Sequence, residues 1–262
     1  MTPLEQRTAF VTGGAAGIGL AIAKTLATRG ANVYIADIDE GAVENAVASV
    51  PGSTGVHVDV TDRSSLEAAR HRVYADRGRL DILVANAGVS SMHRFLELTE
   101  GEWDRNFVVN AKGTFLTLQC FAKAMVEQPI PEGDELRGKM IATASMAARC
   151  AAPLLAHYSA SKFAVIGLVQ AAAKELAGHK LTLNGVNPGF VSTGMQAREL
   201  AWEAQLRGMT PDAVRNEYID MTPLGRIEAP EDVAKAVAFL AGPDSDFLTG
   251  EILEVNGGAH MT

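Results

Sequence analysis

The sequence predicts an α/β fold, a doubly wound parallel sheet of seven strands with helices on both faces, and three observations support this prediction. Short apolar runs rich in β-branched residues alternate with stretches of helical periodicity along the 262-residue chain. These runs are hydrophobic almost throughout, which is typical of strands that helices bury on both faces. Repeated strand–helix–strand units imply parallel strands joined by right-handed crossovers.

The predicted elements alternate along the chain. Strands are expected at 8–12, 32–36, 55–60, 80–85, 139–144, 181–186 and 251–255. Helices are expected at 17–29, 40–50, 64–77, 99–127, 156–177 and 229–241. The helix 99–127 is predicted to be continuous, because Trp103, Phe107, Phe115 and Leu118 share its apolar stripe. Chains of this length with this alternation form a single domain, here residues 1–262.

Residues 194–221 interrupt the alternation. The segment has a helical pattern and carries Met195, Trp202, Met209, Tyr218 and Met221. Long insertions near strand ends are often lids over an active site, and flanking glycines favour that interpretation here. The alternative is an extra pair of helices packed on the core.

Composition excludes several classes of protein. A net charge of -8 argues against a nucleic-acid partner, which requires a basic surface. No apolar run approaches the ~20 residues that span a bilayer, and the polar start, residues 1–7, does not resemble a secretory signal, so we expect a cytoplasmic protein without a membrane partner. Cys120 and Cys150 are expected to be reduced thiols. No pair of the six histidines has metal-ligand spacing, so no metal site is expected.

A glycine-rich segment, residues 12–19, lies between the first strand and its helix. Glycines there allow a tight turn and close approach of the backbone to a pyrophosphate, whose oxygens the free N–H groups of the helix start can bind. Because the cluster directly follows an apolar strand and opens a helix, it predicts a dinucleotide site. The residues concerned are Gly13, Ala16, Gly17, Ile18 and Gly19.

Asp37 ends the second strand, where a carboxylate can accept hydrogen bonds from the adenosine ribose. A carboxylate would repel the 2′-phosphate of NADP, and neither Ala16 nor Ile38 supplies a cation for that phosphate. The sequence therefore favours NAD. Asp37 could also cap the next helix, and the two roles are compatible.

These motifs resemble the short-chain dehydrogenase/reductase family over nearly the whole chain. The resemblance implies one Rossmann-type, dinucleotide-binding catalytic domain that interconverts an alcohol and a ketone. It also implies adenine contacts from Asp59 and Val60, and nicotinamide contacts from the turn Pro188–Gly189. Further cofactor contacts are implied for Asn86, Ala87, Gly88, Val191 and Thr193.

Tyr158 and Lys162 lie four residues apart and therefore on one helix face. A phenol ordinarily ionises near pH ~10, and an ammonium ~4 Å away is worth about 4 kcal/mol at an effective dielectric of ~20. That interaction lowers the phenol's pKa by roughly three, although burial of the phenol opposes it. Tyr158 is thus the expected proton acceptor, and Lys162 is expected to hold the nicotinamide ribose and to make Tyr158 more acidic.

Two further residues complete the expected catalytic set. Ser145 ends the fifth strand, where its hydroxyl can polarise a carbonyl at the carboxyl edge of the sheet. Asn110 lies within a helix although asparagine is a weak helix former. The resemblance implies that Asn110 supports a water that relays protons to Lys162. His93, His157 and Cys150 are expected to have no catalytic role.

The substrate is less clearly indicated. Small apolar residues around 146–157 and the methionines of 194–221 suggest a moderately apolar pocket, and the sequence also resembles polyol and acetoin-type dehydrogenases. We expect a small-molecule polyol, diol or sugar-alcohol substrate and its ketone. An NAD(P)H-dependent reductase of 3-oxoacyl thioesters or hydrophobic ketones is an alternative, and a non-catalytic NAD sensor is another. The resemblance implies a homotetramer.

Overall fold

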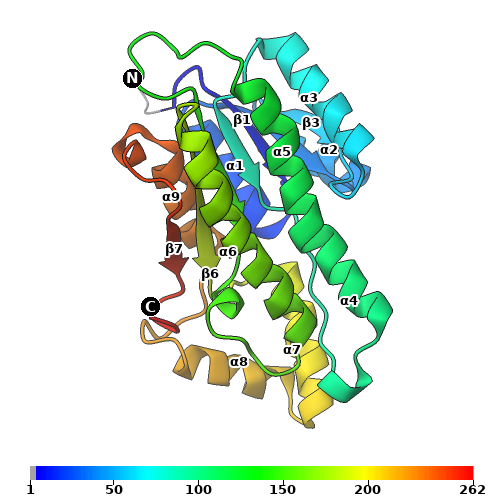
Figure 1. The fold of residues 1–262 in the computed structure, drawn as a ribbon. Coiled ribbons are helices and arrows are strands. Elements are labelled where there is room, and N and C mark those ends of the chain that lie inside the picture. Colours follow the sequence, from blue (N-terminus) through cyan, green and yellow to red (C-terminus); the bar gives the residue numbers. More distant parts are fainter. Residues whose placement is uncertain (1–3, 262) are drawn as a thin grey trace.

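One parallel sheet forms the centre of the molecule in the computed structural model, which describes residues 4–261 (Figure 1). The strand order is β3-β2-β1-β4-β5-β6-β7, and this confirms the predicted doubly wound, seven-stranded fold. The strands are β1 (Thr8–Thr12), β2 (Asn32–Asp37), β3 (Thr54–His57), β4 (Ile82–Ala85), β5 (Gly138–Thr143), β6 (Leu181–Pro188) and β7 (Ile252–Val255). Residues 1–3 and residue 262 lie outside the described part. Residues 1–3 belong to the start of the chain, 1–7, for which no secretory signal is expected.

Helices cover both faces of the sheet. Side chains of α3, α5 and α6 form one core with the sheet, and those of α1, α2 and α9 form the other. The helices are α1 (Gly17–Thr28), α2 (Glu40–Ser49), α3 (Arg63–Arg77), α4 (Glu100–Asn106), α5 (Thr114–Met125), α6 (Ala156–Ala177), α7 (Gly194–Arg207), α8 (Pro211–Asp220) and α9 (Pro230–Ala241). No helix in residues 4–261 is both long enough and apolar enough to cross a membrane.

Two strands are shorter than predicted because side chains bind the backbone at their ends. The third strand stops at His57 rather than at residue 60, where the Asp59 carboxylate accepts the Thr61 N–H at 2.8 Å and turns the chain. The fourth strand begins at Ile82 rather than at residue 80. The amide of Gln128 binds both the N–H and the carbonyl of Leu80, at 3.1 and 2.7 Å, and so replaces a neighbouring strand there.

The predicted continuous helix 99–127 is wrong in one detail. A π-helical segment, Phe107–Gly113, separates α4 from α5. Within it, Asn110 is fully buried and its carbonyl accepts the Thr114 hydroxyl at 2.7 Å. Single π-turns inside α-helices are frequent at functional sites, and this one turns an asparagine amide toward the loop after β4.

The expected insertion forms α7 and α8, which lie beyond the carboxyl ends of β6 and β7 (Figure 1). Together they bury a small separate cluster around Ala204, Val214 and Tyr218. The Tyr218 ring stacks on Phe190, with 3.9 Å between ring centroids. The two helices thus pack mainly on each other and on the loop after β6.

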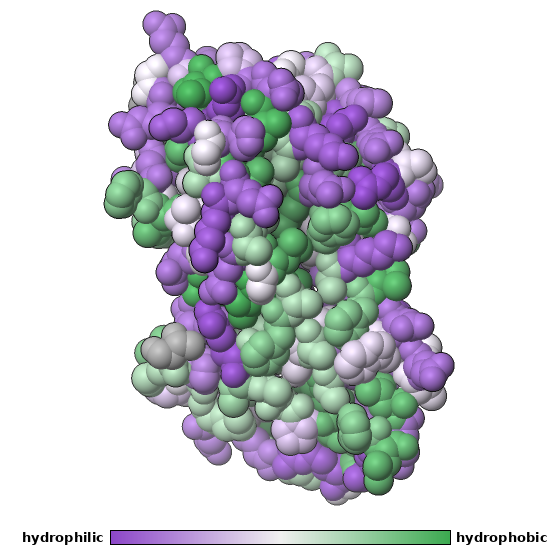
Figure 2. Space-filling model, viewed as in Figure 1, coloured by the Kyte–Doolittle hydropathy of each residue, from purple (hydrophilic) through white to green (hydrophobic). Residues whose placement is uncertain are grey.

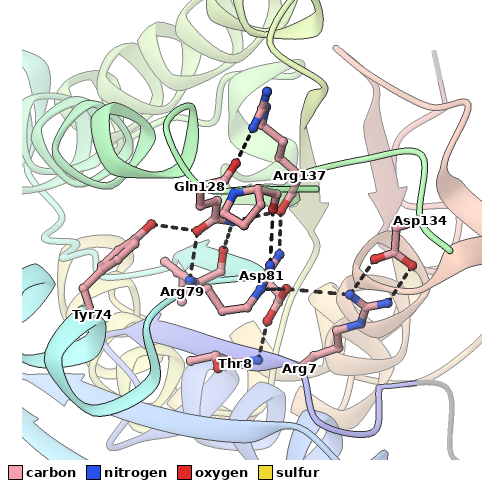
Figure 3. A network of polar contacts seen from close by, with 10 residues as sticks. Arg7, Thr8, Tyr74, Arg79, Asp81, Gln128, Asp134 and Arg137 are labelled. Atoms are coloured by element: carbon pink, nitrogen blue, oxygen red, sulfur yellow. Dashed lines mark hydrogen bonds and ion pairs between the residues drawn. The ribbon is translucent and has the colours of Figure 1, made fainter. Parts of the chain in front are cut away.

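A buried carboxylate ties the amino edge of the sheet together, opposite the strand ends just described (Figure 3). Asp81 is 5% exposed and accepts the backbone N–H of Thr8 at 2.8 Å and the Arg79 guanidinium at 2.7 Å. Arg7 lies 3.7 Å from the same carboxylate and bonds more closely to Asp134, at 2.8 Å. Asp81 therefore joins β1 to β4, whereas the Asp134 carboxylate pairs with the Arg7 guanidinium alone among the described residues.

We expect Asp81→Ala to lower the free energy of unfolding by about 2–4 kcal/mol, because it strands a buried N–H and a half-buried guanidinium. Asp134→Ala removes one partner of a more exposed pair and should cost less than about 1 kcal/mol. Urea unfolding midpoints measure both. Equal losses in the two variants would contradict the central position given to Asp81.

Candidate active site

The glycine loop after β1 has a backbone that only glycine accommodates. Gly13 and Gly17 have φ of 61° and 51°, in the left-handed region. A Cβ on Gly13 would lie 2.8 Å from Ala87 Cα, and one on Gly19 would lie 2.0 Å from the Gly13 carbonyl oxygen. The loop is therefore packed directly against the segment that follows β4.

The first turn of α1 is left open for an anion. No side chain caps this helix at Ala16, and its first turn carries no acidic residue. By contrast, Asp39 caps α2 and Asp62 caps α3. Uncapped N–H groups at the positive end of a helix bind phosphate oxygens, so the residues present fit the pyrophosphate of a dinucleotide.

Asp37 lies at the end of β2 beside the glycine loop. Its carboxylate accepts the N–H groups of Ala15 and Asp39, both at 3.3 Å. Asp39, not Asp37, is the N-cap of α2, so the alternative capping role for Asp37 is wrong. Ile38 and Ala16 have uncharged side chains, so neither places a cation beside the Asp37 carboxylate.

The segment after β4 holds the glycine loop in place. The Asn86 amide donates to the carbonyls of Thr12 and Gly13, at 3.1 and 3.2 Å, and accepts from the Thr143 hydroxyl at 3.1 Å. Asn86 therefore braces the ends of three strands, β1, β4 and β5. Ala87 contacts the glycine loop, as described above.

Asp59 and Val60 lie in the turn after β3. The Asp59 carboxylate is engaged with Thr61, whose hydroxyl lies 2.7 Å away. Val60 is buried, and a Cβ on Gly113 would lie 2.9 Å from one of its methyl groups. Val60 thus packs against the π-helical segment that carries Asn110.

Asn110 fixes the loop after β4 from the other side. Its amide accepts the Val89 N–H at 2.8 Å and donates to the Val89 carbonyl at 2.9 Å. The same amide nitrogen donates to Ser161 at 3.0 Å, on α6. The structure therefore brings Asn110 next to the Tyr158–Lys162 face of α6.

Lys162 lies near both Tyr158 and Gly88. The Lys162 ammonium donates to the Thr143 carbonyl at 2.9 Å and lies 5.9 Å from the centroid of the Tyr158 ring. A Cβ on Gly88 would lie 3.4 Å from Lys162 Nζ and 3.2 Å from Asn110 Oδ1. Lys162 and Asn110 thus approach each other beside Gly88, in the loop after β4.

Burial dominates the electrostatics of this pair in the protein alone. Burial raises the pKa of Tyr158 above its usual range; the nearby Glu199 carboxylate adds to the rise, and a hydrogen bond with Ser145 opposes it. Burial lowers the pKa of Lys162 to about 8. Lys162 was expected to lower the phenol's pKa and burial to oppose it, and in the protein alone burial is the larger of the two effects.

Ser145 follows β5 at the same edge. Its hydroxyl accepts the Ala147 N–H at 3.1 Å, which begins a short 3₁₀ turn, Met146–Ala148. Its backbone N–H donates to the Asn187 side chain at 3.2 Å, and Asn187 in turn donates to Glu254 at 2.7 Å. The sequence analysis missed Asn187, although its place at the end of β6 was a usable signal.

Pro188 ends β6, and the loop after it contains Gly189, Val191 and Thr193. A Cβ on Gly189 would lie 2.9 Å from Asn256, so the two chain segments touch. Thr193 caps α7 by accepting the Gln196 N–H at 3.2 Å. Val191 is buried, and a Cβ on Gly17 would lie 3.2 Å from the Thr193 methyl group, which places this loop across from the glycine loop.

Two carboxylates that the sequence did not single out also lie here. Glu199 on α7 is partly exposed and acts on Tyr158 electrostatically, as described above. Glu228 is 7% exposed and accepts the Gly189 N–H at 2.8 Å, while its second oxygen has no partner. Burial raises the pKa of Glu228 to about 7. No local pattern marks either residue, because both contacts join segments far apart in the chain.

Comparisons with known proteins agree with this geometry. Residues 13–260 match a family model described as enoyl-(acyl carrier protein) reductase. The chain is 37% identical to L-2,3-butanediol dehydrogenase of Corynebacterium glutamicum, covering 96% of this chain and 98% of that protein. It is 33% identical to galactitol 2-dehydrogenase of Agrobacterium fabrum, covering 99% of both chains.

Another relative is named for the reduction of a 3-oxoacyl group. The chain is 32% identical to 3-oxoacyl-[acyl-carrier-protein] reductase of Thermotoga maritima, covering 97% of this chain and 98% of that protein. Among solved structures, a short-chain type dehydrogenase/reductase from Mycobacterium marinum superposes with a TM-score of 0.87 at 31% identity. That match covers 100% of this chain and 98% of the other.

The raised pKa of Glu228 should make the stability of the fold depend on pH. Its pKa is about 7 in the folded protein against 4.5 ordinarily, so the folded state holds more protons between these values and stability falls as pH rises through them. Glu228→Gln mimics the protonated form and should raise the melting temperature at pH 8 but not at pH 4.5. The corresponding gain in the free energy of unfolding at pH 8 is at most about 3 kcal/mol. Glu231→Gln, an exposed change of equal charge, should show no such gain. A Glu228→Gln variant no more stable than wild type at pH 8 would contradict this assignment.

Proposed function

Because the chain belongs to the short-chain dehydrogenase/reductase family and is an oxidoreductase, we propose that it interconverts a secondary alcohol and its ketone with NAD. The observation that carries the proposal is the placement of Lys162 beside both Tyr158 and Gly88, with Asn110 also beside Gly88, while the start of α1, after the neighbouring strand β1, is uncapped. A nicotinamide cofactor supplies the hydride acceptor for such a site.

The residues divide the proton chemistry among them. Oxidation of the alcohol removes a hydride from carbon and a proton from oxygen. Tyr158 Oη takes the proton, and Ser145 donates a hydrogen bond to the developing ketone oxygen. Lys162, held by Thr143, presents its charge to the cofactor ribose and to Tyr158. Reduction follows the same path in reverse.

Three further features belong to the proposal. Asp37, with no cation from Ala16 or Ile38 beside it, supports NAD over NADP. The helices α7 and α8 (194–221) act as a lid over the single catalytic domain. The remaining cofactor contacts come from Gly13, Gly17, Ile18, Gly19, Asp59, Val60, Asn86, Ala87, Gly88, Pro188, Gly189, Val191 and Thr193.

The substrate we propose is a small diol, polyol or sugar alcohol. Two relatives of this chain are named for a diol and for a sugar alcohol. In addition, the Glu199 carboxyl group acts on the catalytic phenol, and a polar group there suits a second substrate hydroxyl better than an acyl chain. Reduction of 3-oxoacyl thioesters is the second candidate, supported by the names of the family model and of the Thermotoga relative.

A homotetramer remains a prediction, and one surface supports it. Figure 2 shows apolar residues gathered on the face where α4, α5 and α6 lie in Figure 1. Trp103, Phe115 and Phe163 are 39%, 38% and 46% exposed on these elements. Large exposed apolar patches usually mark interfaces. The cytoplasmic location is likewise still a prediction.

A screen of secondary alcohols with NAD, then NADP, tests the proposal as a whole. We expect turnover of vicinal diols or polyols with NAD at a higher kcat/KM than 3-oxoacyl thioester reduction. The reverse order would favour the second candidate, and NADH binding without turnover of any alcohol or ketone would favour a non-catalytic sensor.

Tyr158→Phe tests the proposed proton transfer. Loss of the hydroxyl should lower kcat by roughly 10²–10⁴-fold while NADH affinity changes little, because the phenol exchanges the proton. Tyr74→Phe is a matched control: Tyr74 donates to Gln128 at 2.9 Å, far from this edge, and its kcat should stay unchanged. Wild-type kcat in Tyr158→Phe would exclude the proposed role of Tyr158.

A further inference from the structure

Three potential metal ligands meet beside the proposed active site. His93 comes from the loop after β4, Glu102 from α4 and His157 from the first turn of α6. One ligand atom from each lies within 4.8 Å of the other two, the only such group of three in residues 4–261. His93 Nε2 lies 3.7 Å from Glu102 Oε2, and the two imidazole centroids are 5.7 Å apart. We call these three residues the His–Glu cluster.

Ser91 lies inside the cluster. Its hydroxyl donates to Glu102 Oε2 at 2.8 Å and lies 2.9 Å from His157 Nε2. Ser91 therefore links the carboxylate to the buried imidazole.

The buried imidazole keeps one ring nitrogen without a protein partner. His157 is 0% exposed, and its Nδ1 is buried without a hydrogen-bond partner, whereas its Nε2 contacts Ser91. A neutral imidazole carries an electron pair on one of its two nitrogens, and a carboxylate and a neutral imidazole are the forms that bind a metal.

We propose that the His–Glu cluster binds a divalent transition-metal ion of the zinc type. Two imidazoles and one carboxylate form a common zinc ligand set, and imidazole nitrogen disfavours calcium and magnesium. Bond lengths of about 2.0–2.2 Å place tetrahedral ligands roughly 3.3–3.5 Å apart, so the cluster must contract by up to about 1.5 Å. His93 and Glu102 have side chains 33% and 29% exposed, and they can make that movement.

The ion would join three segments: the loop after β4, α4 and the start of α6. The His93 backbone N–H already bonds to the Leu154 carbonyl at 3.0 Å, so the loop lies against the segment that leads into α6. A bound ion would fix this loop to α4 and α6 one residue before Tyr158. A fourth position remains for water, because His93 and Glu102 face solvent in part.

Zinc binding to the intact protein tests the proposal without an activity assay. After treatment with EDTA and its removal, ZnCl₂ titrated by calorimetry should bind at one ion per chain and raise the melting temperature. His93→Ala and Glu102→Gln should each weaken binding at least tenfold. His57→Ala is the matched control, since His57 also faces a carboxylate, Glu40, at 3.9 Å but has no third ligand; it should bind zinc as the wild type does.

The control also excludes non-specific zinc binding. Circular dichroism of each variant before titration separates loss of a ligand from loss of fold, and the buried His157 is left unchanged for that reason. No heat of binding at millimolar zinc, wild-type affinity in both cluster variants, or an equal loss in His57→Ala would each overturn the proposal. None of these outcomes depends on whether the protein oxidises an alcohol.

Discussion

The proposed chemistry depends on an ammonium held in a buried place. Lys162 gives up most of its hydration, which lowers its pKa to about 8, and donates one hydrogen bond to the Thr143 carbonyl. The adjacent Tyr158 is partly exposed, and desolvation raises its pKa. Neither group is ready for proton transfer in the protein alone. A bound oxidised nicotinamide would bring positive charge to the phenol and ribose hydroxyls to the ammonium, and would change both balances in the useful direction.

The rest of the fold holds that pair at the carboxyl edge of the sheet. Three asparagine amides fix the loops at the carboxyl ends of the strands. Asn86 ties the glycine loop to β5, Asn110 fixes the loop after β4, and Asn187 holds Ser145. Each amide both donates and accepts, so it satisfies backbone groups that loops would otherwise leave unpaired. The π-helical segment has the same purpose, because it turns Asn110 toward Val89.

The sequence predicted what depends on local pattern. Apolar runs located the seven strands along the chain, and the glycine loop predicted the dinucleotide site. The spacing of Tyr158 and Lys162 predicted that both lie on one face of a helix. It failed where distant segments meet. The end of β3 depends on the turn made by Asp59, and Leu80 leaves β4 because Gln128, 48 residues later, binds its backbone. The burial that raises the pKa of Tyr158, and the carboxylates Glu199 and Glu228, likewise follow from packing.

The most direct test of the central claim is the ionisation of Tyr158 itself. Ultraviolet difference titration of wild type against Tyr158→Phe isolates this phenol, first in the protein alone and then in its complex with NAD. The account predicts a pKa above 10 in the protein alone, where burial prevails, and a value below 10 in the complex, where positive charge offsets burial. If the phenol in the NAD complex still ionised only above pH 10, Tyr158 could not serve as the proton acceptor, and the proposed mechanism would be wrong.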